Sequence, residues 1–269
     1  LFFYENFNCI FTQYEEKERY KVEIIFSIKY DLDFFISFCN NSVNFKENLL
    51  ASLVGNPIVK TFKSEEEDNW IKFLKPVSVG SNYKVIAPWD STGSNNEIII
   101  NPSIAFGTGH HETTSSCLEL LLKIKYIFSL EKKIDSILDI GTGSGILSIF
   151  SLKVFKSQIT GIDNDYDAIE QAKKNLKLNT NLSNIDFQLK ELDNIKDTYD
   201  LIIANISIEY LLVNIYKIYE KLNPNSFLLI SGFLFTRISS LNLLLIEEKF
   251  SIMSIIHKND WISMVIKKK

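Results

Sequence analysis

A glycine-rich stretch at residues 137–147, Ile-Leu-Asp-Ile-Gly-Thr-Gly-Ser-Gly-Ile-Leu, constrains the fold of this chain more than any other feature. A short apolar run leads into glycines at alternating positions, and an apolar, helix-like segment follows. A second apolar run then ends at Asp163. Strand, turn, helix and strand in this order predict the start of a βαβ unit. Glycines at such a turn let the backbone approach a ligand that a Cβ atom would exclude.

The acids around this turn indicate which nucleoside it binds. Asp163, at the end of the second strand, is placed to accept hydrogen bonds from both ribose hydroxyls. The dinucleotide pattern G-x-G-x-x-G requires a third glycine where this chain has Ile146. Asp139, two residues before Gly141, would repel a pyrophosphate and suits a ligand with a cationic end, such as S-adenosylmethionine. The alternative is an ordinary glycine turn in an α/β protein.

The composition indicates a globular protein with a large core. Of the 269 residues, 46% are hydrophobic and 23% are charged, and the net charge is −4. Because lysines and glutamates are mixed along the chain, we expect no direct nucleic-acid partner. No apolar run reaches the length of a membrane span, and the first residues lack signal-peptide features, so we expect no membrane partner. Three widely spaced cysteines suggest buried thiols in a reducing compartment, which predicts a cytoplasmic protein.

The sequence pattern divides the chain into three parts. Residues 1–62 mix strand-like and helical segments and predict a small α+β domain. Residues 63–76 predict a linker helix, because Ser64 and Glu67 form a capping box and Pro76 ends the helix. Residues 77–269 contain the glycine turn and are expected to form the larger domain.

Further apolar segments predict additional elements. They are a strand at 20–28, a helix at 31–39, a hairpin of 83–89 with 97–100, a helix near 236–248 and an antiparallel hairpin of 252–256 with 261–266.

A second glycine loop lies at residues 101–114 and opens a helix. Glycines and hydroxyls at a helix start suit carboxylate or hydroxyl groups of a ligand. Thr114 either serves only at the helix start or also faces the cofactor. His110, His111 and Glu112 raise the question of a metal site. Adjacent side chains point in different directions, and no distant His or Cys cluster completes a site, so we expect no metal.

Residues 200–206, Asp-Leu-Ile-Ile-Ala-Asn-Ile, predict a strand of a parallel sheet that is covered on both faces. Asn205 lies at its carboxyl end, where ligands bind in open α/β sheets. It is therefore a candidate binding residue, and the alternative is an asparagine that only forms a turn.

Four sequence blocks, in this order, resemble the family of ribosomal protein L11 methyltransferases. The blocks are residues 85–89, 101–114, 137–147 with 161–163, and 200–206. The pattern A-F-G-T-G-x-H-x-T-T in the second block is the specific one, because the glycine motif occurs in many methyltransferases. The resemblance covers about residues 64–269.

The resemblance implies an α/β fold with a Rossmann-like seven-stranded methyltransferase sheet. It also implies a small N-terminal α+β domain that grips the ribosomal protein, and a helical linker. It places contacts to S-adenosylmethionine at Thr114, Gly141, Asp163 and Asn205, and Gly143 of the same glycine motif is a fifth candidate. Relatives often carry a small-residue and proline stretch after the A-N-I strand, where this chain has residues 207–210, Ser-Ile-Glu-Tyr.

The expected activity is transfer of methyl groups from S-adenosylmethionine to lysine or α-amino nitrogens of ribosomal protein L11. The attacking nitrogen has to be neutral, because an ammonium has no lone pair. No side chain stands out as a strong general base, so we expect positioning, with Asn205 orienting the amine, to supply most of the rate. Two alternatives are a methyltransferase acting on RNA or a small molecule, and a non-enzymatic binding scaffold.

Overall fold

The computed structural model describes residues 9–16, 19–26, 75–102, 109–128, 133–179, 182–241 and 249–269. Contacts between residues divide the chain into two compact units, Leu1–Glu66 and Glu67–Lys269. The domain boundaries expected at residues 62 and 76 remain a prediction.

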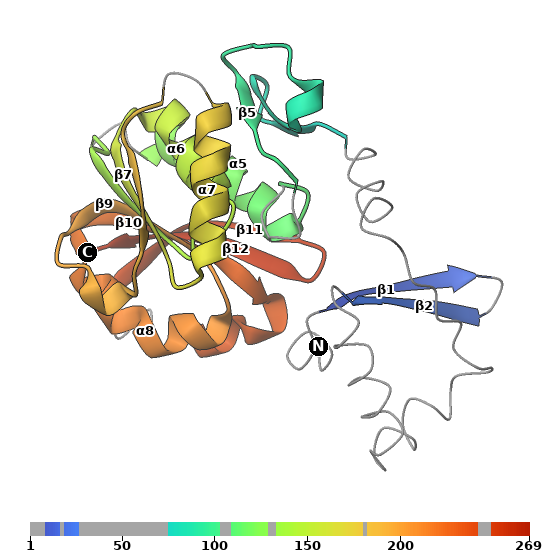
Figure 1. Ribbon diagram of the computed structural model, residues 1–269. Helices are drawn as coiled ribbons and strands as arrows, with labels where there is room; N and C mark the ends of the chain where they lie inside the picture. Colours follow the sequence, from blue (N-terminus) through green and yellow to red (C-terminus); the bar gives the residue numbers. More distant parts are fainter. Residues whose placement is uncertain are drawn as a thin grey trace. The chain divides into compact units, whose positions relative to one another are not determined.

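In the first unit, the described residues form an antiparallel pair of strands, β1 (Cys9–Glu16) and β2 (Arg19–Phe26) (Figure 1). β2 matches the strand expected over residues 20–28. The helix expected over residues 31–39, and all but the last two residues of the linker helix expected over 63–76, lie outside the described residues.

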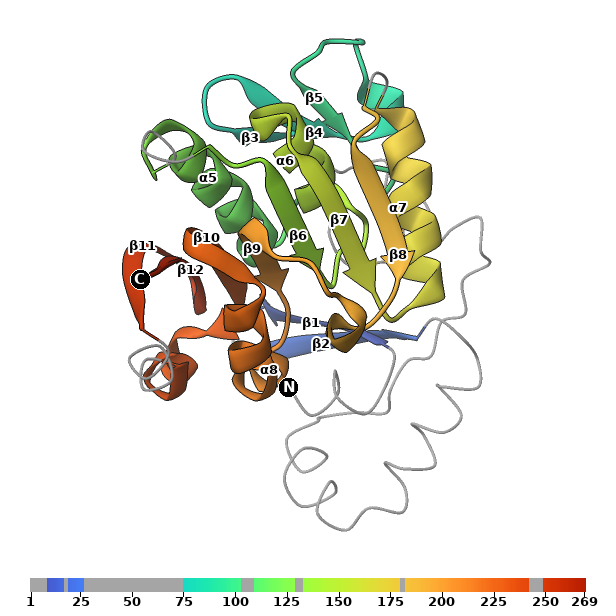
Figure 2. The ribbon, with the colours of Figure 1, turned by 90° about the vertical axis from the view of Figure 1, so that its left-hand side faces the viewer.

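The described residues of the second unit are organised around a seven-stranded, mostly parallel sheet (Figures 1 and 2). Five strands run parallel in the order β10-β9-β6-β7-β8. The sheet continues beyond β10, where β12 pairs antiparallel with β10 and β11 pairs antiparallel with β12. The strands are β6 (Ser136–Ile140), β7 (Gln158–Asp163), β8 (Ile185–Leu189), β9 (Tyr199–Asn205), β10 (Leu222–Leu234), β11 (Phe250–Lys258) and β12 (Trp261–Lys268). The Rossmann-like sheet and the C-terminal hairpin expected from the sequence are confirmed.

Helices cover both faces of this sheet. Helices α5 and α6 share one apolar core with the sheet, α8 shares the other, and α7 lies beside α6 along β7 and β8. Their bounds are α5 (Glu112–Tyr126), α6 (Ile146–Phe155), α7 (Tyr166–Leu178) and α8 (Ile208–Glu220). The helix expected near residues 236–248 begins with a 3-10 turn, η6 (Phe235–Arg237), and most of it lies outside the described residues.

Strand β9 shows why a central strand reads as an unbroken apolar run. Leu201 and Ile203 face the core of α5 and α6, whereas Ile202 and Ala204 face the core of α8. All four side chains are fully buried. The expectation of a strand covered on both faces is confirmed, because alternate residues of a strand point to opposite faces.

The hairpin expected between residues 83–89 and 97–100 is wrong. β4 (Tyr83–Ile86) and β5 (Glu97–Ile99) pair in parallel, and the antiparallel partner of β4 is β3 (Val77–Val79). Apolar periodicity predicts the two strands but not the direction in which they pair.

The connection between these two strands explains the parallel pairing. A 3-10 turn, η3 (Pro88–Asp90), and the loop after it return the chain to the start of β4 before β5 begins. The buried carboxylate of Glu97 organises this loop by accepting hydrogen bonds from the Ser91 hydroxyl, the Thr92 hydroxyl and backbone, and the Gly93 backbone. These hydrogen bonds keep the pKa of Glu97 below its ordinary value although burial acts to raise it.

A close backbone approach joins β10 to the residue that follows β9. Gly232 has a φ of +93°, and a Cβ atom there would lie 2.4 Å from the carbonyl oxygen of Ile206. The pairing of β10 with β12 shifts register at this point, between Ile230 and Phe233. Only glycine fits, because both the left-handed conformation and the space exclude a side chain.

We expect Gly232→Ala to lower the free energy of unfolding by about 3 kcal/mol, through backbone strain and overpacking against Ile206. Gly93→Ala is the matched control, since Gly93 also has a positive φ, +80°, but faces open space. Strain alone should cost the control about 1 kcal/mol. Urea denaturation followed by circular dichroism measures both, and equal losses would contradict the importance of the close approach.

Candidate active site

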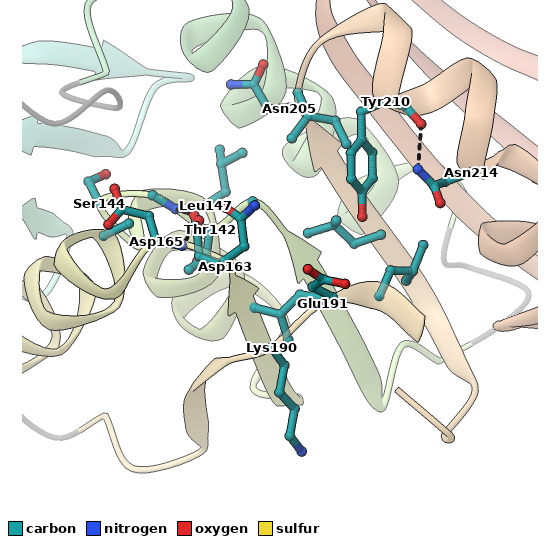
Figure 3. Close-up of a pocket in the computed structure, with 18 of the residues that line it drawn as sticks. Thr142, Ser144, Leu147, Asp163, Asp165, Lys190, Glu191, Asn205, Tyr210 and Asn214 are labelled. Carbon is teal, nitrogen blue, oxygen red and sulfur yellow. Dashed lines mark hydrogen bonds between the residues drawn. The ribbon is translucent and has the colours of Figure 1, made fainter. Parts of the chain in front are cut away.

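A cavity of about 650 Å³ lies where β6, β7 and β9 end and α8 begins (Figure 3). Ligands bind at this carboxyl edge in open α/β sheets. The polar residues that line the cavity are Thr114, Thr142, Ser144, Asp163, Asn164, Asp165, Lys190, Glu191, Asp193, Asn205, Tyr210, Asn214 and Lys217.

The structure brings all five candidate binding residues to this cavity. They come from four separate elements, since Thr114 lies in the first turn of α5, Gly141 and Gly143 follow β6, and Asp163 and Asn205 end β7 and β9. The assembly follows from the parallel sheet, in which consecutive strands end at the same edge.

The first glycine of the turn is required by the space around it. Gly141 has a φ of +68°, and a Cβ atom there would lie 2.6 Å from Cγ2 of Ile206. The backbone N–H groups of Gly141 and Thr142 both donate to the carbonyl oxygen of Ile162, which fastens the turn to the end of β7. The turn is therefore held against the end of β7, and its glycines present backbone to the cavity.

Asp163 is oriented by two backbone hydrogen bonds. The N–H of Gly143 donates to its Oδ2 at 3.0 Å, and the N–H of Asp165 donates to its Oδ1 at 3.1 Å. Each carboxylate oxygen can accept more than one hydrogen bond. Both oxygens can therefore accept a further hydrogen bond from two neighbouring hydroxyl groups of a ligand that enters the cavity.

Asp139 does not face the cavity, and the expectation that its carboxylate meets the cationic end of a ligand is wrong. The side chain is 1% exposed and accepts hydrogen bonds from the hydroxyls of Thr142, at 2.8 Å, and Ser148, at 2.7 Å. Both donors lie on the turn and helix that follow, so the carboxylate stabilises the glycine turn from behind. Burial raises the pKa of Asp139 from 3.8 to about 6, against the two hydroxyls, which act to lower it.

Asn205 presents an amide oxygen without a hydrogen-bond partner in the described part of the chain. Its Nδ2 donates to the hydroxyl of Thr114 at 3.5 Å, whereas its buried Oδ1 has no hydrogen-bond partner among the described residues. A buried, unpaired acceptor is costly, and such atoms in native proteins commonly mark functional positions. The contact to α5 disfavours the alternative of an asparagine that only forms a turn.

Helix α8 contributes residues to the cavity that the sequence pattern did not predict. Tyr210, Asn214 and Lys217 lie on one face of this helix and line the cavity. In Figure 3, Tyr210 extends from α8 toward Glu191, and the side-chain amide of Asn214 donates to the backbone oxygen of Tyr210 at 3.0 Å. Burial raises the pKa of Tyr210. The spacing i, i+4 and i+7 indicates a shared helix face but not what that face covers.

Helix α8 is also tied to the loop after β8. Lys217 Nζ lies 2.6 Å from Oδ1 of Asp193, and both residues line the cavity. This ion pair connects two walls of the cavity. Because it is exposed to solvent, it contributes little to the stability of the fold.

The two adjacent histidines diverge as their sequence positions suggest. His110 Nε2 lies 2.9 Å from the backbone oxygen of Lys75, whereas His111 Nδ1 lies 2.8 Å from the hydroxyl of Thr113. In the part of the chain that the structure describes, no three His, Cys, Asp or Glu side chains are grouped to hold a metal ion. No helix among the described residues is long and apolar enough to cross a membrane.

Comparison with known proteins identifies relatives over most of the chain. The ribosomal protein L11 methyltransferase family matches residues 4–269. A protein of that name from Caldanaerobacter subterraneus subsp. tengcongensis is 33% identical over 95% of this chain and 82% of its own length. Another, from Geotalea uraniireducens, is 36% identical over 66% of this chain, and the aligned part spans 60% of that relative.

A solved structure supports the same assignment. The ribosomal protein L11 methylase of Lactobacillus delbrueckii subsp. bulgaricus is similar with a TM-score of 0.63 and 25% sequence identity. The match covers 73% of this chain and 100% of that structure. The sequence resemblance is confirmed, and this chain belongs to the ribosomal protein L11 methyltransferase family.

Proposed function

We propose that this chain is an S-adenosylmethionine-dependent methyltransferase that methylates ribosomal protein L11 on lysine or α-amino nitrogens. The Oδ1 of Asn205 carries the proposal: it is buried at the cavity, has no hydrogen-bond partner among the residues that the structure describes, and is an acceptor suited to an N–H group. Membership of the ribosomal protein L11 methyltransferase family supports ribosomal protein L11 as the methyl acceptor. The expected cytoplasmic location and the expected absence of a nucleic-acid partner remain predictions.

The cavity fits S-adenosylmethionine by its polar groups and by its glycine wall. Asp163 offers two oriented oxygens to the ribose hydroxyls, and the turn at Gly141 and Gly143 leaves room for the backbone to meet the ligand. Thr114 and Asn205, which contact each other, also line the cavity. When bound, the methyl donor supplies a carbon attached to a positively charged sulfur, which is open to attack by a neutral amine.

The charges around the cavity favour cationic ligands. Among the described residues, four carboxylates line it, those of Asp163, Asp165, Glu191 and Asp193, against two lysines. An excess of one sign raises the local concentration of ligands of the opposite sign. Both the sulfonium donor and a lysine-bearing acceptor are cationic before the reaction.

Asn205 is the side chain that we assign to orienting the acceptor nitrogen. An N–H group of a neutral amine that donates to Oδ1 has its lone pair directed away from the amide. Correct alignment of the reacting atoms accounts for a large part of many enzymatic rates. This role requires no proton transfer to Asn205, which agrees with an amide in place of a carboxylate.

We expect Asp163→Ala to weaken binding of S-adenosylmethionine about a hundredfold, since it removes the two charge-assisted hydrogen bonds that we assign between the carboxylate and the ribose hydroxyls. Asp167→Ala is the matched control, because Asp167 is an exposed carboxylate on α7 that does not line the cavity. Isothermal titration calorimetry measures both affinities. Equal affinities of the Asp163 variant and the wild type would reject the ribose assignment.

We expect Asn205→Ala to reduce turnover about a hundredfold, because the acceptor loses its alignment. Asn223→Ala is the control, since Asn223 lies at the amino end of β10, where it donates to Asp200. Transfer of labelled methyl groups to purified ribosomal protein L11, with RNA as the competing acceptor, measures the activity, and mass spectrometry locates the nitrogen. Label on RNA alone would overturn the proposed function, and near-normal turnover of the Asn205 variant would overturn its role.

We expect Asp139→Asn to stabilise the folded protein increasingly as the pH rises. The pKa of Asp139 is higher in the folded state than in the unfolded chain, so its favourable contribution is complete below about pH 4 and is lost as the pH rises through about 6. The variant lacks this loss, and its advantage over the wild type should grow by up to about 3 kcal/mol between pH 4 and pH 7. Urea denaturation across this range tests the sign, and a pH-independent difference would contradict it.

A further inference from the structure

The first turn of α5 connects the donor site to the residue just before the helix. Thr114 on this turn lines the cavity, is 1% exposed and accepts the hydrogen bond of Asn205. His111 is the N-cap of α5, and its Nδ1 lies 3.3 Å from the backbone nitrogen of Thr113, which donates to it. The hydroxyl of Thr113 also lies 2.8 Å from Nδ1 of His111. The capping hydrogen bond of His111 is therefore made to Thr113, the residue directly before Thr114.

This cap requires a neutral imidazole. Nδ1 can accept the N–H of Thr113 only while it carries a lone pair, and a protonated ring has a hydrogen on both nitrogens. Ser, Thr, Asp and Asn are the usual N-cap residues, and they keep an acceptor oxygen at neutral pH. His111 gives α5 a cap that protonation removes.

The turn between β11 and β12 supports His111 from the other side. The ring of Trp261 meets the imidazole edge to face, with 4.9 Å between centroids and 71° between planes. The same turn donates three hydrogen bonds to the first two turns of α5, from Lys258 Nζ to Ser115 Oγ (2.6 Å) and Glu119 Oε1 (2.7 Å), and from Asn259 Nδ2 to Glu112 Oε1 (2.8 Å).

The position of this turn explains how it reaches the site. Leu234 at the end of β10 pairs with Trp261, and Ser231 of β10 pairs with Asn205. The turn between β11 and β12 is therefore at the same edge of the sheet as the cavity. It clamps the start of α5 at that edge.

The surroundings favour the neutral ring. The half-buried position lowers the pKa of His111, and the carboxylate of Glu112, 3.9 Å from Nε2, acts in the opposite direction. The hairpin carries Lys258 and Asp260 on either side of Asn259, and Trp261 is uncharged. Lys258 engages Glu119, and Asn259 engages Glu112, so these partners are fixed around the imidazole.

We propose that His111 is a positioning residue for the donor site, because its neutral imidazole, held between Thr113 and Trp261, fixes the turn that carries Thr114. The role concerns donor affinity and so rests on the proposed function. Protonation of His111 releases the cap and weakens the hold of α5 on the donor.

Two substitutions at position 111 separate capping from mere occupancy. His111→Ala removes the acceptor, and we expect donor affinity to fall about fivefold, which is the typical effect of losing a helix cap. His111→Asn keeps a capping oxygen and should retain the wild-type affinity. His257→Asn, which removes an exposed imidazole on β11, is the matched control and should change nothing. Calorimetry with S-adenosylhomocysteine measures the affinities, and the Michaelis constant for the donor should rise more than kcat falls in the alanine variant.

The wild-type protein provides a second test that needs no variant to fold. By reciprocal linkage, S-adenosylhomocysteine should lower the pKa of His111 in an NMR titration of the ring. Without ligand, amide exchange at Thr113 and Thr114 should accelerate as His111 becomes protonated, and this acceleration should be missing in His111→Asn. Comparison of the two proteins at each pH removes the contribution of Asp139, which titrates nearby.

An asparagine variant as weak as the alanine variant would overturn the proposal, and so would a His111 pKa that the ligand leaves unchanged. Failure of the wild type to bind S-adenosylhomocysteine would instead reject the proposed function. Amide exchange in the free protein would still decide the capping role, because it requires no ligand: exchange that is independent of His111 protonation overturns that role.

Discussion

The site depends on the confinement of Ile206 between two glycines. In the sheet, β9 lies between β6 and β10, and each neighbour presents a glycine to the residue that follows β9. A Cβ atom on Gly141 would strike the side chain of Ile206, and one on Gly232 would strike its backbone. Because Asn205 directly precedes Ile206, the same confinement sets where its amide lies. The end of β6 and the bend in β10 approach the end of β9 closely because neither has a side chain at the contact with Ile206.

The parts of the site that follow from local pattern were predictable from the sequence. The glycine turn, Asp163 and Asn205 each lie at the end of an apolar run, and parallel strands end at a common edge. The orientation of Asp139 was not predictable in this way. The sequence shows a carboxylate beside the turn, but its side of the strand depends on the hydroxyls of Thr142 and Ser148, which bind it away from the cavity. The parallel pairing of β4 and β5 likewise depends on a loop whose anchor, Glu97, reads as an ordinary strand residue.

The two aspartates of the βαβ unit show how environment separates identical side chains. Asp139 is buried, receives hydroxyl hydrogen bonds and has a raised pKa, so it serves the fold of the turn. Asp163 receives backbone hydrogen bonds and keeps lone pairs directed at the cavity. Helix α8 contributes a different kind of surface, because Tyr210, Asn214 and Lys217 line the cavity from one face of the helix. The strand ends thus supply the carboxylate and amide groups of the cavity, and α8 supplies a helix face beside them.

The antiparallel end of the sheet also bears on the chemistry. If β12 ran parallel to β10, the connection before it would lie at the opposite edge, away from the cavity. Reversal of β12 places the turn that precedes Trp261 at the carboxyl edge, where Phe235 N donates to the carbonyl oxygen of Asp260 at 2.8 Å. From there the hairpin reaches the start of α5, which enters the site from a separate part of the chain. Thr114 therefore owes its position to two distant segments, β9 through Asn205 and the C-terminal hairpin through His111.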